Sequence, residues 1–434
     1  MRKLIAALAL AATLLPVIAG AAEPAPAATP LSLEQAVAVA LKQNLSYRAA
    51  RVGVDAANAQ LRQAESPRLP GVALRDTYQY VNPVAKLDTP FGELPFSTTN
   101  ATNVPLIGLQ YTLFDGGLTA ARVGQAAAGL AASRASEREA RGAVVTAVST
   151  AYYDLIAAGR LAGVANRAVD VADQHLKQAQ QLYTNGMIPK ADVLRAETEL
   201  ANERVNAIGA ANAVELAQTN LDNTLNVPLT NVYEPTDDLT GAPPPSFNLD
   251  ALLAGARTDR GELAAARASV TAAEAAVNEA KSGYLPQIGL TVANGNTQPA
   301  VVSGYHNQFS IGLSAVWTLF DHGYTSGRVA AARAGVEQAK IGLNQLEDGV
   351  ELQVRQAYLN VNEATSRVTA AQRLADLAAE NLRLAQVRYR GGVSTALELQ
   401  DAELRNTSAQ QTLVGAEVGL RESIVQLRFA AGLL

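Results

Sequence analysis

The chain has 434 residues, a formal net charge of −5 at pH 7 and no cysteine. The lack of cysteine excludes disulfide frameworks, thiolate catalysis and cysteine-ligated zinc. The mild charge excludes a nucleic-acid partner, because such a partner requires a basic stripe, and arginines here are interleaved with acidic residues. Apolar residues make up 48% of the chain and aromatic residues only 5%. This composition favours long helices packed through small side chains over a bulky globular core.

The first 22 residues have the features of a signal peptide. Met1-Arg2-Lys3 gives a short positive start, an apolar run extends from Leu4 to Ile18, and small residues follow at 19–22. The run is too short for a spanning helix, and no later stretch of about 20 apolar residues follows it. We therefore expect residues 1–22 to be removed on export, with the exact cleavage position left open.

The remaining chain is interpreted as two repeats, residues 23–230 and 249–434, joined by a proline-rich linker at 231–248. Each repeat should contain a helix, two strands and a long helical hairpin. In chain order, we expect a helix at Leu33–Glu65, strands at Val72–Tyr80 and Ile107–Leu113, helices at Gly117–Tyr183 and Asp192–Asn226, a helix at Leu249–Lys281, strands at Ile288–Val292 and Phe309–Leu319, and a second hairpin whose last helix is Thr395–Phe429.

The duplication is clearest in the long helices. Apolar residues recur with steps of four and three, which is typical of a coiled-coil seam. The twelve positions of the first seam are Val144, Val148, Ala151, Leu155, Ala158, Ala162, Ala165, Val169, Ala172, Leu176, Ala179 and Tyr183. Those of the second are Val350, Val354, Ala357, Val361, Ala364, Val368, Ala371, Ala375, Ala378, Leu382, Ala385 and Tyr389. A helix of roughly 65 residues would extend on the order of 100 Å, so it must project from any compact domain.

The four strand segments alternate between apolar and polar residues. Such alternation over about ten residues is typical of transmembrane barrel strands, although half-buried strands of a soluble sheet show it too. Four strands cannot close a barrel, and an open edge is not tolerated in lipid. The membrane interpretation therefore predicts a barrel shared among subunits. Tyr111 and Trp317, near strand ends, are candidates for an aromatic belt in contact with outer-membrane lipid.

The turns at strand and helix ends carry a family resemblance. The supporting residues are Phe114-Asp115-Gly116-Gly117 and Phe320-Asp321-His322-Gly323 at the strand-to-helix turns. More specific are Tyr183-Thr184-Asn185-Gly186-Met187 with Asp192-Val193-Leu194, and Tyr389-Arg390-Gly391-Gly392-Val393 with Glu398-Leu399-Gln400-Asp401-Ala402. In order and duplication, these motifs make the chain resemble the outer membrane efflux protein (TolC-like) family over nearly its whole mature length.

The resemblance implies a mostly α fold with a small transmembrane β part. Long duplicated hairpins would form a trimeric α-barrel, and four strands per subunit would contribute to a shared twelve-stranded β-barrel. It also implies a homotrimer in the cell outer membrane, with a long periplasmic extension and an equatorial collar built partly from linker and terminal segments. The helical tips, at Gly186, Met187, Gly392 and Val393, would dock onto a periplasmic adaptor (membrane fusion) protein that couples to an inner-membrane transporter.

The resemblance further suggests a periplasmic gate. Glu398 and Asp401 align with positions that form acidic rings, Asp192 with a carboxylate that helps to hold the gate shut, and Tyr389 belongs to the same tip motif. A ring of carboxylates would favour cations at a constriction. The alternative is structural, because Thr395-x-x-Glu398 is a capping box and Asp192 suits a helix first turn. Where some members carry an arginine lock, this chain has Ser394, with Arg390 as a possible replacement.

No catalytic, cofactor or metal motif is found in the sequence. His175, His306 and His322 do not have metal-binding spacing, so a solvated or structural role is expected for them. We therefore expect a passive outer-membrane channel for small-molecule efflux and no enzyme activity. A conduit for type I protein secretion and a non-pore periplasmic coiled-coil scaffold are the alternatives. The cargo and the identity of the pump cannot be read from the sequence.

Overall fold

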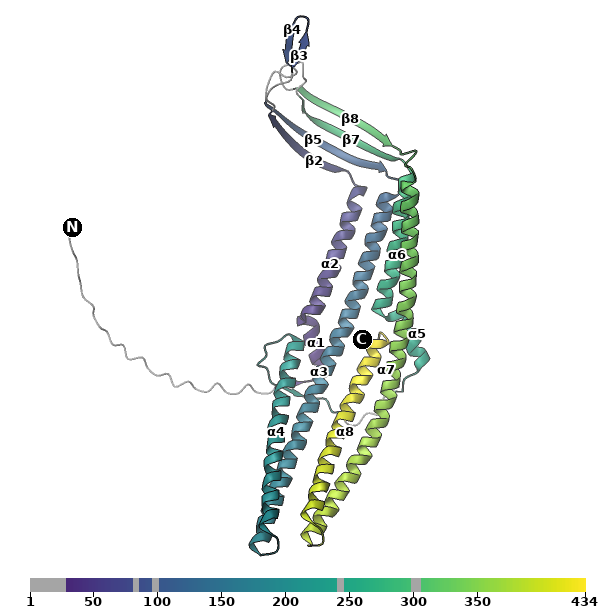
Figure 1. Cartoon of the computed structure of the whole chain (residues 1–434). Helices are drawn as coiled ribbons and strands as arrows, with labels where there is room; N and C mark the ends of the chain where they lie inside the picture. Colours follow the sequence, from purple (N-terminus) through teal and green to yellow (C-terminus); the bar gives the residue numbers. More distant parts are fainter. Residues whose placement is uncertain (1–28, 81–85, 96–100, 240–245, 298–305) are drawn as a thin grey trace, which may run out of the picture.

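The computed structural model describes residues 29–80, 86–95, 101–239, 246–297 and 306–434. The expected signal peptide, residues 1–22, lies outside these ranges. The molecule is elongated, with a sheet at one end (Figure 1). Long helices run from the sheet to the other end, where the tips of two helical hairpins lie. Within the described ranges, no helix combines the length and the apolar character needed to cross a membrane.

Eight α-helices, four per repeat, make up most of the described chain. The two longest, α3 and α7, have 67 residues each, as the matching seams predicted. The helices of the first repeat are α1 (Leu33–Gln43), α2 (Leu45–Glu65), α3 (Leu118–Thr184) and α4 (Lys190–Leu225), and those of the second are α5 (Leu249–Asp259), α6 (Gly261–Lys281), α7 (Tyr324–Arg390) and α8 (Ala396–Ala430). Single 3-10 turns, η1 (Ser66–Arg68) and η2 (Ser282–Tyr284), follow α2 and α6.

The prediction of one continuous helix at the start of each repeat was wrong. The first breaks at Asn44, whose side-chain oxygen accepts hydrogen bonds from the backbone N–H groups of Ser46 and Tyr47 at 2.9 and 3.2 Å. The second breaks at Arg260, which has an extended ψ of 123°. An asparagine that caps the next helix competes with helix continuation, and the apolar periodicity did not reveal this.

The main sheet has four antiparallel strands in the order β2-β5-β7-β8, so β2 and β8 are its edges. The strands are β2 (Gly71–Tyr80), β5 (Ala101–Phe114), β7 (Gln287–Thr297) and β8 (His306–Val316). Strand β8 ends before Trp317 and Leu319, which were expected inside it. A separate hairpin, β3 (Lys86–Thr89) and β4 (Gly92–Pro95), lies between β2 and β5, where no strand was expected.

The register of the sheet gives it two chemically different faces. Val72 pairs with Leu109, Leu109 with Val292, and Val292 with Ile311, so one row across all four strands is aliphatic. The neighbouring row on the other face consists of Ala73, Gly108, Ala293 and Ser310. The alternation noted in the sequence is therefore continued from strand to strand, because paired residues point to the same face.

The seams lie buried between neighbouring helices. Val148 and Val354, at the same position of the two repeats, are both inaccessible to solvent. In the upper half of the molecule the packing order is α2-α3-α6-α7, and in the lower half it is α4-α3-α8-α7. One seam position departs from the repeat: Tyr389 is 7% exposed, whereas Tyr183 is 45% exposed. Helix α3 packs against helices of both repeats, chiefly α2, α4, α6 and α8, whereas α7 packs chiefly against α5, α6 and α8 of its own repeat.

The middle of the molecule is held by contacts between the short strand before α1, the linker and α3. Strand β1 (Thr29–Leu31) pairs in parallel with β6 (Tyr233–Pro235). The Tyr152 hydroxyl, fully buried on α3, lies 2.9 Å from the Leu31 carbonyl oxygen and 2.7 Å from Oδ2 of Asp237. Arg160 joins the linker to the second repeat through Asp238 and Glu417, at 2.5 and 2.7 Å.

The two long helices start in the same way. Asp115 accepts hydrogen bonds from the N–H groups of Gly117 and Thr119, and Asp321 accepts them from Gly323 and Thr325. Desolvation of Asp115 opposes ionisation, but the bonds from Thr119, Gly117 and Leu118 prevail and lower its pKa. The strand-to-helix motifs therefore act as helix caps that fix the direction of α3 and α7 beneath the sheet.

Candidate gate and inter-hairpin site

The end of the molecule away from the sheet consists of two helical hairpins, α3–α4 and α7–α8 (Figure 1). Gly186 and Gly392 have a φ of 71° in their turns, a conformation that glycine adopts without the strain a Cβ brings. The N–H of Met187 bonds to the Leu182 carbonyl at 2.9 Å and that of Val393 to the Arg388 carbonyl at 3.0 Å. The turns are thus built alike, and both Met187 and Val393 expose their side chains.

Each carboxylate singled out for the gate has an arginine of the same chain beside it. Asp192 pairs with Arg195 at 3.0 Å, and Asp401 with Arg405 at 2.8 Å. An Arg388 nitrogen lies 3.6 Å from Glu398 Oε2, which also accepts a hydrogen bond from the Ser394 hydroxyl. The charge available to an acidic ring is therefore partly compensated within the subunit.

The structural alternative for Glu398 applies in part. Thr395 caps α8 by accepting a bond from the Glu398 N–H at 3.2 Å, as in a capping box. The Glu398 side chain, however, bonds to Ser394. Arg390, proposed as a replacement lock, donates to the Gln386 carbonyl of its own helix at 3.3 Å. Within this chain, Ser394 therefore fixes the Glu398 side chain, and Arg390 fixes the end of α7.

Tyr389 belongs to a second group of residues, one level above the tips. Its ring meets that of His175 edge-on, with the centroids 5.4 Å apart. Burial raises the pKa of Tyr389, and the carboxylates of Asp192 and Glu403 add to the effect. The structure therefore places Tyr389 near Asp192, another residue of the proposed gate. Its direct neighbour is His175, which the sequence did not identify as a site residue.

His175 and Glu403 come from different hairpins and meet in the interior. His175 is 8% exposed, and its Nδ1, which has no hydrogen-bond partner, lies 3.8 Å from Oε2 of Glu403. Burial lowers the pKa of His175. Burial, assisted by the charges of Glu199 and Glu203, raises the pKa of Glu403 to about 7. The solvated role allowed for His175 is excluded, since the side chain is buried.

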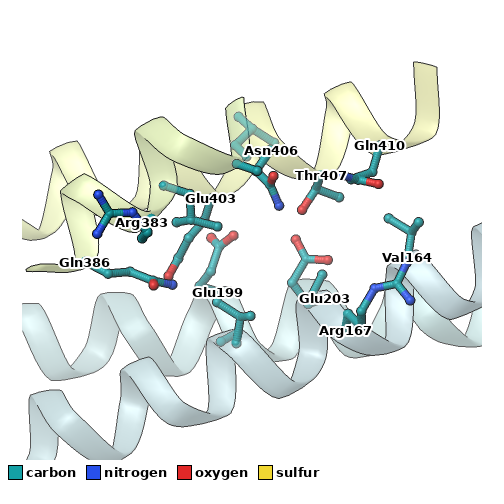
Figure 2. A pocket seen from close by; sticks show the side chains of 16 residues that line it. Val164, Arg167, Glu199, Glu203, Arg383, Gln386, Glu403, Asn406, Thr407 and Gln410 are labelled. Atoms are coloured by element: carbon teal, nitrogen blue, oxygen red, sulfur yellow. The ribbon is translucent and has the colours of Figure 1, made fainter. Parts of the chain in front are cut away.

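A cavity of about 370 Å³ lies between the hairpins at this level and is lined by α3, α4, α7 and α8. Figure 2 places Glu199, Glu203 and Glu403 on its wall, from α4 and α8. Glu199 accepts a hydrogen bond from Gln400 at 2.6 Å, which joins α4 to α8. Arg383, also on the wall, is already paired with Glu380 at 2.7 Å. The wall thus carries three glutamates together with Arg383 and Arg167.

The two candidates for an aromatic belt lie on or beside the sheet. Tyr111 is in β5 opposite Leu290 of β7. Trp317 follows β8, is exposed, and its indole N–H donates to the Tyr284 carbonyl at 3.0 Å. Among the described residues there is no cluster of three or more histidine or acidic side chains that could hold a metal ion.

The duplicated hairpins beneath a four-stranded sheet define the class of the protein: it has the fold of outer-membrane channel proteins. It superposes on the outer membrane protein VceC from Vibrio cholerae with a TM-score of 0.78 and 21% identity, covering 92% of this chain and 96% of that one. The chain belongs to the outer membrane efflux protein family, whose model matches residues 36–227 and 252–433.

Curated relatives extend over most of the chain. Outer membrane protein TolC of Escherichia coli is 24% identical over 425 residues, which cover 93% of this chain and 82% of TolC. The probable efflux pump outer membrane protein TtgC of Pseudomonas putida is 23% identical over 415 residues, covering 92% and 83% respectively. The two matched segments of the family model lie within residues 23–230 and 249–434, one in each repeat, and neither includes any of the linker 231–248.

Proposed function

We propose that this chain is one subunit of the outer-membrane channel of a tripartite efflux system. It would act as a passive exit duct for small molecules that an inner-membrane pump expels through a periplasmic adaptor. Membership of the outer membrane efflux protein family, matched in both repeats, is the observation that carries the proposal. The family is one of channels, so no catalytic role is assigned to any residue.

The sheet supports a shared barrel. Its two edges, β2 and β8, have no strand partner on their outer side within the described chain, and an unpaired edge is unfavourable in lipid. The aliphatic row Val72, Leu109, Val292 and Ile311 crosses all four strands on one face, which suits contact with acyl chains. The neighbouring row on the other face has small side chains, which suits a water-filled interior. Joining β8 of one subunit to β2 of the next, three times, gives the proposed twelve-stranded barrel.

The repeat also supports lateral assembly of the helices. On α3, Tyr153 packs against the core because α3 has neighbours on both flanks. The offset of 206 residues that relates Val144 to Val350 takes Tyr153 to Leu359 of α7, which is 63% exposed. Leu352, Leu359, Leu377 and Leu384 follow one side of α7 opposite its seam, and all are exposed. We infer that the next subunit covers this stripe, as the second repeat covers α3.

The tips and the gate complete the proposal. The exposed Met187 and Val393, held on alike turns by Gly186 and Gly392, would present apolar contacts to the periplasmic adaptor. Asp192, Tyr389, Glu398 and Asp401 would line the periplasmic constriction. Tyr111 and Trp317 would lie in the aromatic belt at the lipid boundary. The β1–β6 pair and the linker would form part of an equatorial collar.

Planar-bilayer recordings of the purified full-length protein test the channel. We expect discrete conductance steps, since a closed barrel over a helical tunnel leaves a continuous water path. Protein that is trimeric but forms no pores would contradict the proposal and favour the scaffold alternative.

Deletion of the gene should also raise the sensitivity of the cells to small toxic compounds. Loss of a secreted protein, with unchanged compound sensitivity, would instead favour the secretion alternative.

The acidic ring is tested by replacing both Glu398 and Asp401 with alanine. Because these carboxylates are partly compensated by Arg388 and Arg405, we expect a modest fall in cation preference, about twofold in the permeability ratio of K⁺ to Cl⁻. Reversal potentials in a salt gradient measure this ratio. The control is Glu363→Ala, which removes an exposed carboxylate of α7 far from the tip. An unchanged ratio in the double variant would place the filter elsewhere.

A further inference from the structure

Three polar or aromatic contacts join the two hairpins at one level, between the tips and the middle of the molecule. His175 of α3 faces Glu403 of α8, the His175 ring meets Tyr389 of α7, and Gln400 of α8 donates to Glu199 of α4. All four periplasmic helices thus take part, and every contact crosses from one hairpin to the other. Any motion that separates the hairpins must break this set.

We propose that His175 and Glu403 form a proton-linked contact that holds the two hairpins together, so that this pair sets the pH response of the gate. The inference rests on the proposed channel function and adds a regulatory site to it. Neither residue lies in the tip turns or among the residues that the family motifs single out.

The geometry leaves room for one proton between the two side chains. Nδ1 of His175 has no hydrogen-bond partner and is 3.8 Å from Glu403 Oε2, and the two side chains are only 8% and 14% exposed. A proton on either group would let a small side-chain movement close that gap into a hydrogen bond. Without it, Glu403 is a buried carboxylate beside the charges of Glu199 and Glu203. Its facing partner is then a neutral imidazole, which compensates that charge only weakly and only if its hydrogen is on Nδ1.

The surrounding charges favour the protonated pair. From α4, Glu199 and Glu203 face Glu403. From α3, His175 faces it and Arg167 lies farther along the cavity wall. From α7 come Tyr389 and Arg383, the latter occupied by Glu380. The nearest charges are therefore carboxylates, and a proton on Glu403 removes their mutual repulsion.

The direction of the pH effect follows from linkage. Glu403 has its pKa raised from 4.5 to about 7 while the hairpins are together. Once exposed by separation it should return toward 4.5, so the joined state binds more protons between these values. The joined state is therefore most stable below about pH 4.5, and this stabilisation is lost as pH rises to about 7. The lowered pKa of His175 acts in the opposite sense but is the smaller shift.

Single-channel recordings with the pH varied on the helical side test the proposal. For the unmodified trimer we expect the ratio of open to closed time to rise between pH 5 and pH 7.5 by at least about tenfold, with about a hundredfold as the upper range. Glu403→Gln keeps a neutral donor at every pH, so it should abolish most of this response and remain closed at pH 7.5. His175→Phe keeps the ring contact with Tyr389 but removes the nitrogen, and should open more at pH 5.

The matched control is Glu197→Gln. Position 197 of α4 is the repeat counterpart of 403, but its side chain is exposed, so the pH response should be unchanged. A wild-type response in Glu403→Gln, or its loss in Glu197→Gln, would overturn the proposal. Absence of any channel activity in all proteins would instead contradict the proposed function.

A second measurement does not depend on conduction. Because the chain has no cysteine, spin labels can be attached through Lys190→Cys and Leu397→Cys, one near each hairpin tip. We expect the distance between labels to lengthen from pH 5 to pH 7.5, and to stay constant when Glu403→Gln is added. Equal lengthening in both proteins would overturn the assignment of Glu403. Circular dichroism of each variant checks that the helices are intact.

Discussion

At the scale of single residues, the two strand-to-helix turns look alike in sequence but are packed differently. Gly116 and His322 occupy the same place, and both have positive φ, at 66° and 52°. A Cβ on Gly116 would lie 2.7 Å from Cβ of Leu285, which sits close to the backbone and cannot move aside. The second turn tolerates a histidine there. The first repeat therefore requires glycine for space as well as for φ.

Gly116→Ala should thus cost more stability than Gly117→Ala. Gly117 also has a positive φ, of 88°, but nothing lies within 4 Å of its added Cβ. We expect Gly117→Ala to cost about 1 kcal/mol from backbone strain alone, and Gly116→Ala to cost about 1–3 kcal/mol more from overlap with Leu285. Thermal unfolding in detergent, followed by helix circular dichroism, measures the difference. Equal losses would mean that the turn relaxes away from Leu285.

At the scale of elements, a buried hydroxyl attaches the linker to α3. Tyr152 reaches both the Leu31 carbonyl and Asp237 Oδ2, and Asp237 also accepts the Leu33 N–H at 2.7 Å. Burial, together with the bond to Asp237, raises the pKa of Tyr152 to about 12. The hydroxyl therefore keeps its proton at every physiological pH and remains a donor to the linker.

Tyr152→Phe should weaken the attachment of the linker to α3. The Leu31 carbonyl or the Asp237 carboxylate then loses one of its two donors, and the Asp237 N–H loses the Tyr152 oxygen that accepts from it at 3.3 Å. We expect these losses to cost about 1–3 kcal/mol. The adjacent Tyr153→Phe is the control, with an expected change within about 0.5 kcal/mol, because its half-buried hydroxyl contributes no hydrogen bond to this cluster. Limited proteolysis at residues 236–239 and unfolding in urea report the effect. Equal sensitivity of both variants would contradict the role of Tyr152.

How much of each element the sequence reveals depends on the range of the interactions that build it. The four-and-three spacing revealed α3 and α7 as long helices, since every member of a seam lies on one helix, and α3 agrees with the expected Gly117–Tyr183 to within a residue at each end. The break at Arg260 was missed because that residue donates to the Phe429 carbonyl at 3.0 Å and to Glu262 at 2.9 Å. The first of these bonds joins positions 169 residues apart, which a local pattern does not reveal. The short hairpin β3–β4 was missed because each of its strands has only four residues.

The candidate site follows the same rule. Gly186, Gly392 and the Thr395 cap could be found because a turn or a cap is local. His175 and Glu403 could not, since each is an ordinary residue within its own helix and the pair exists only where the hairpins pack. The one available signal was weak: His175 directly precedes the seam residue Leu176, on the flank that faces the second hairpin.

At the scale of the whole molecule, the repeat predicts what lies beyond the chain. Asp154 of α3 faces Glu422 of α8, and it adds to the rise in the pKa of Glu422 that burial produces. Their repeat counterparts are Asn360 of α7 and Leu216 of α4, which lie on the free flanks of the subunit. Leu216 of α4 and Leu359 of α7, which directly precedes Asn360, are each 63% exposed. If subunits meet as the repeats do, Leu359 of one subunit approaches Leu216 of the next.

Leu359→Lys should therefore block assembly. An unpaired ammonium group buried between helices is unfavourable, so we expect the proposed trimer to dissociate at a subunit concentration at least about tenfold higher than the wild type does. Leu216→Asp should act in the same way from the other side. The double variant places opposite charges across the interface and should recover part of the trimer, an outcome that neither single change could give by damaging the fold. Native mass spectrometry in detergent measures each population.

The control for this series is Gln372→Lys, at a position that is exposed in both repeats, since its counterpart Asn166 is exposed as well. We expect Gln372→Lys to remain trimeric. Since Asn166 is exposed to solvent where the two repeats pack together, Gln372 should likewise stay exposed where two subunits pack together. Dissociation of Gln372→Lys, or failure of the double variant to recover any trimer, would show that the subunits do not meet in the register of the repeats. Intact trimers of Leu359→Lys would show that the exposed leucine stripe of α7 faces some other surface.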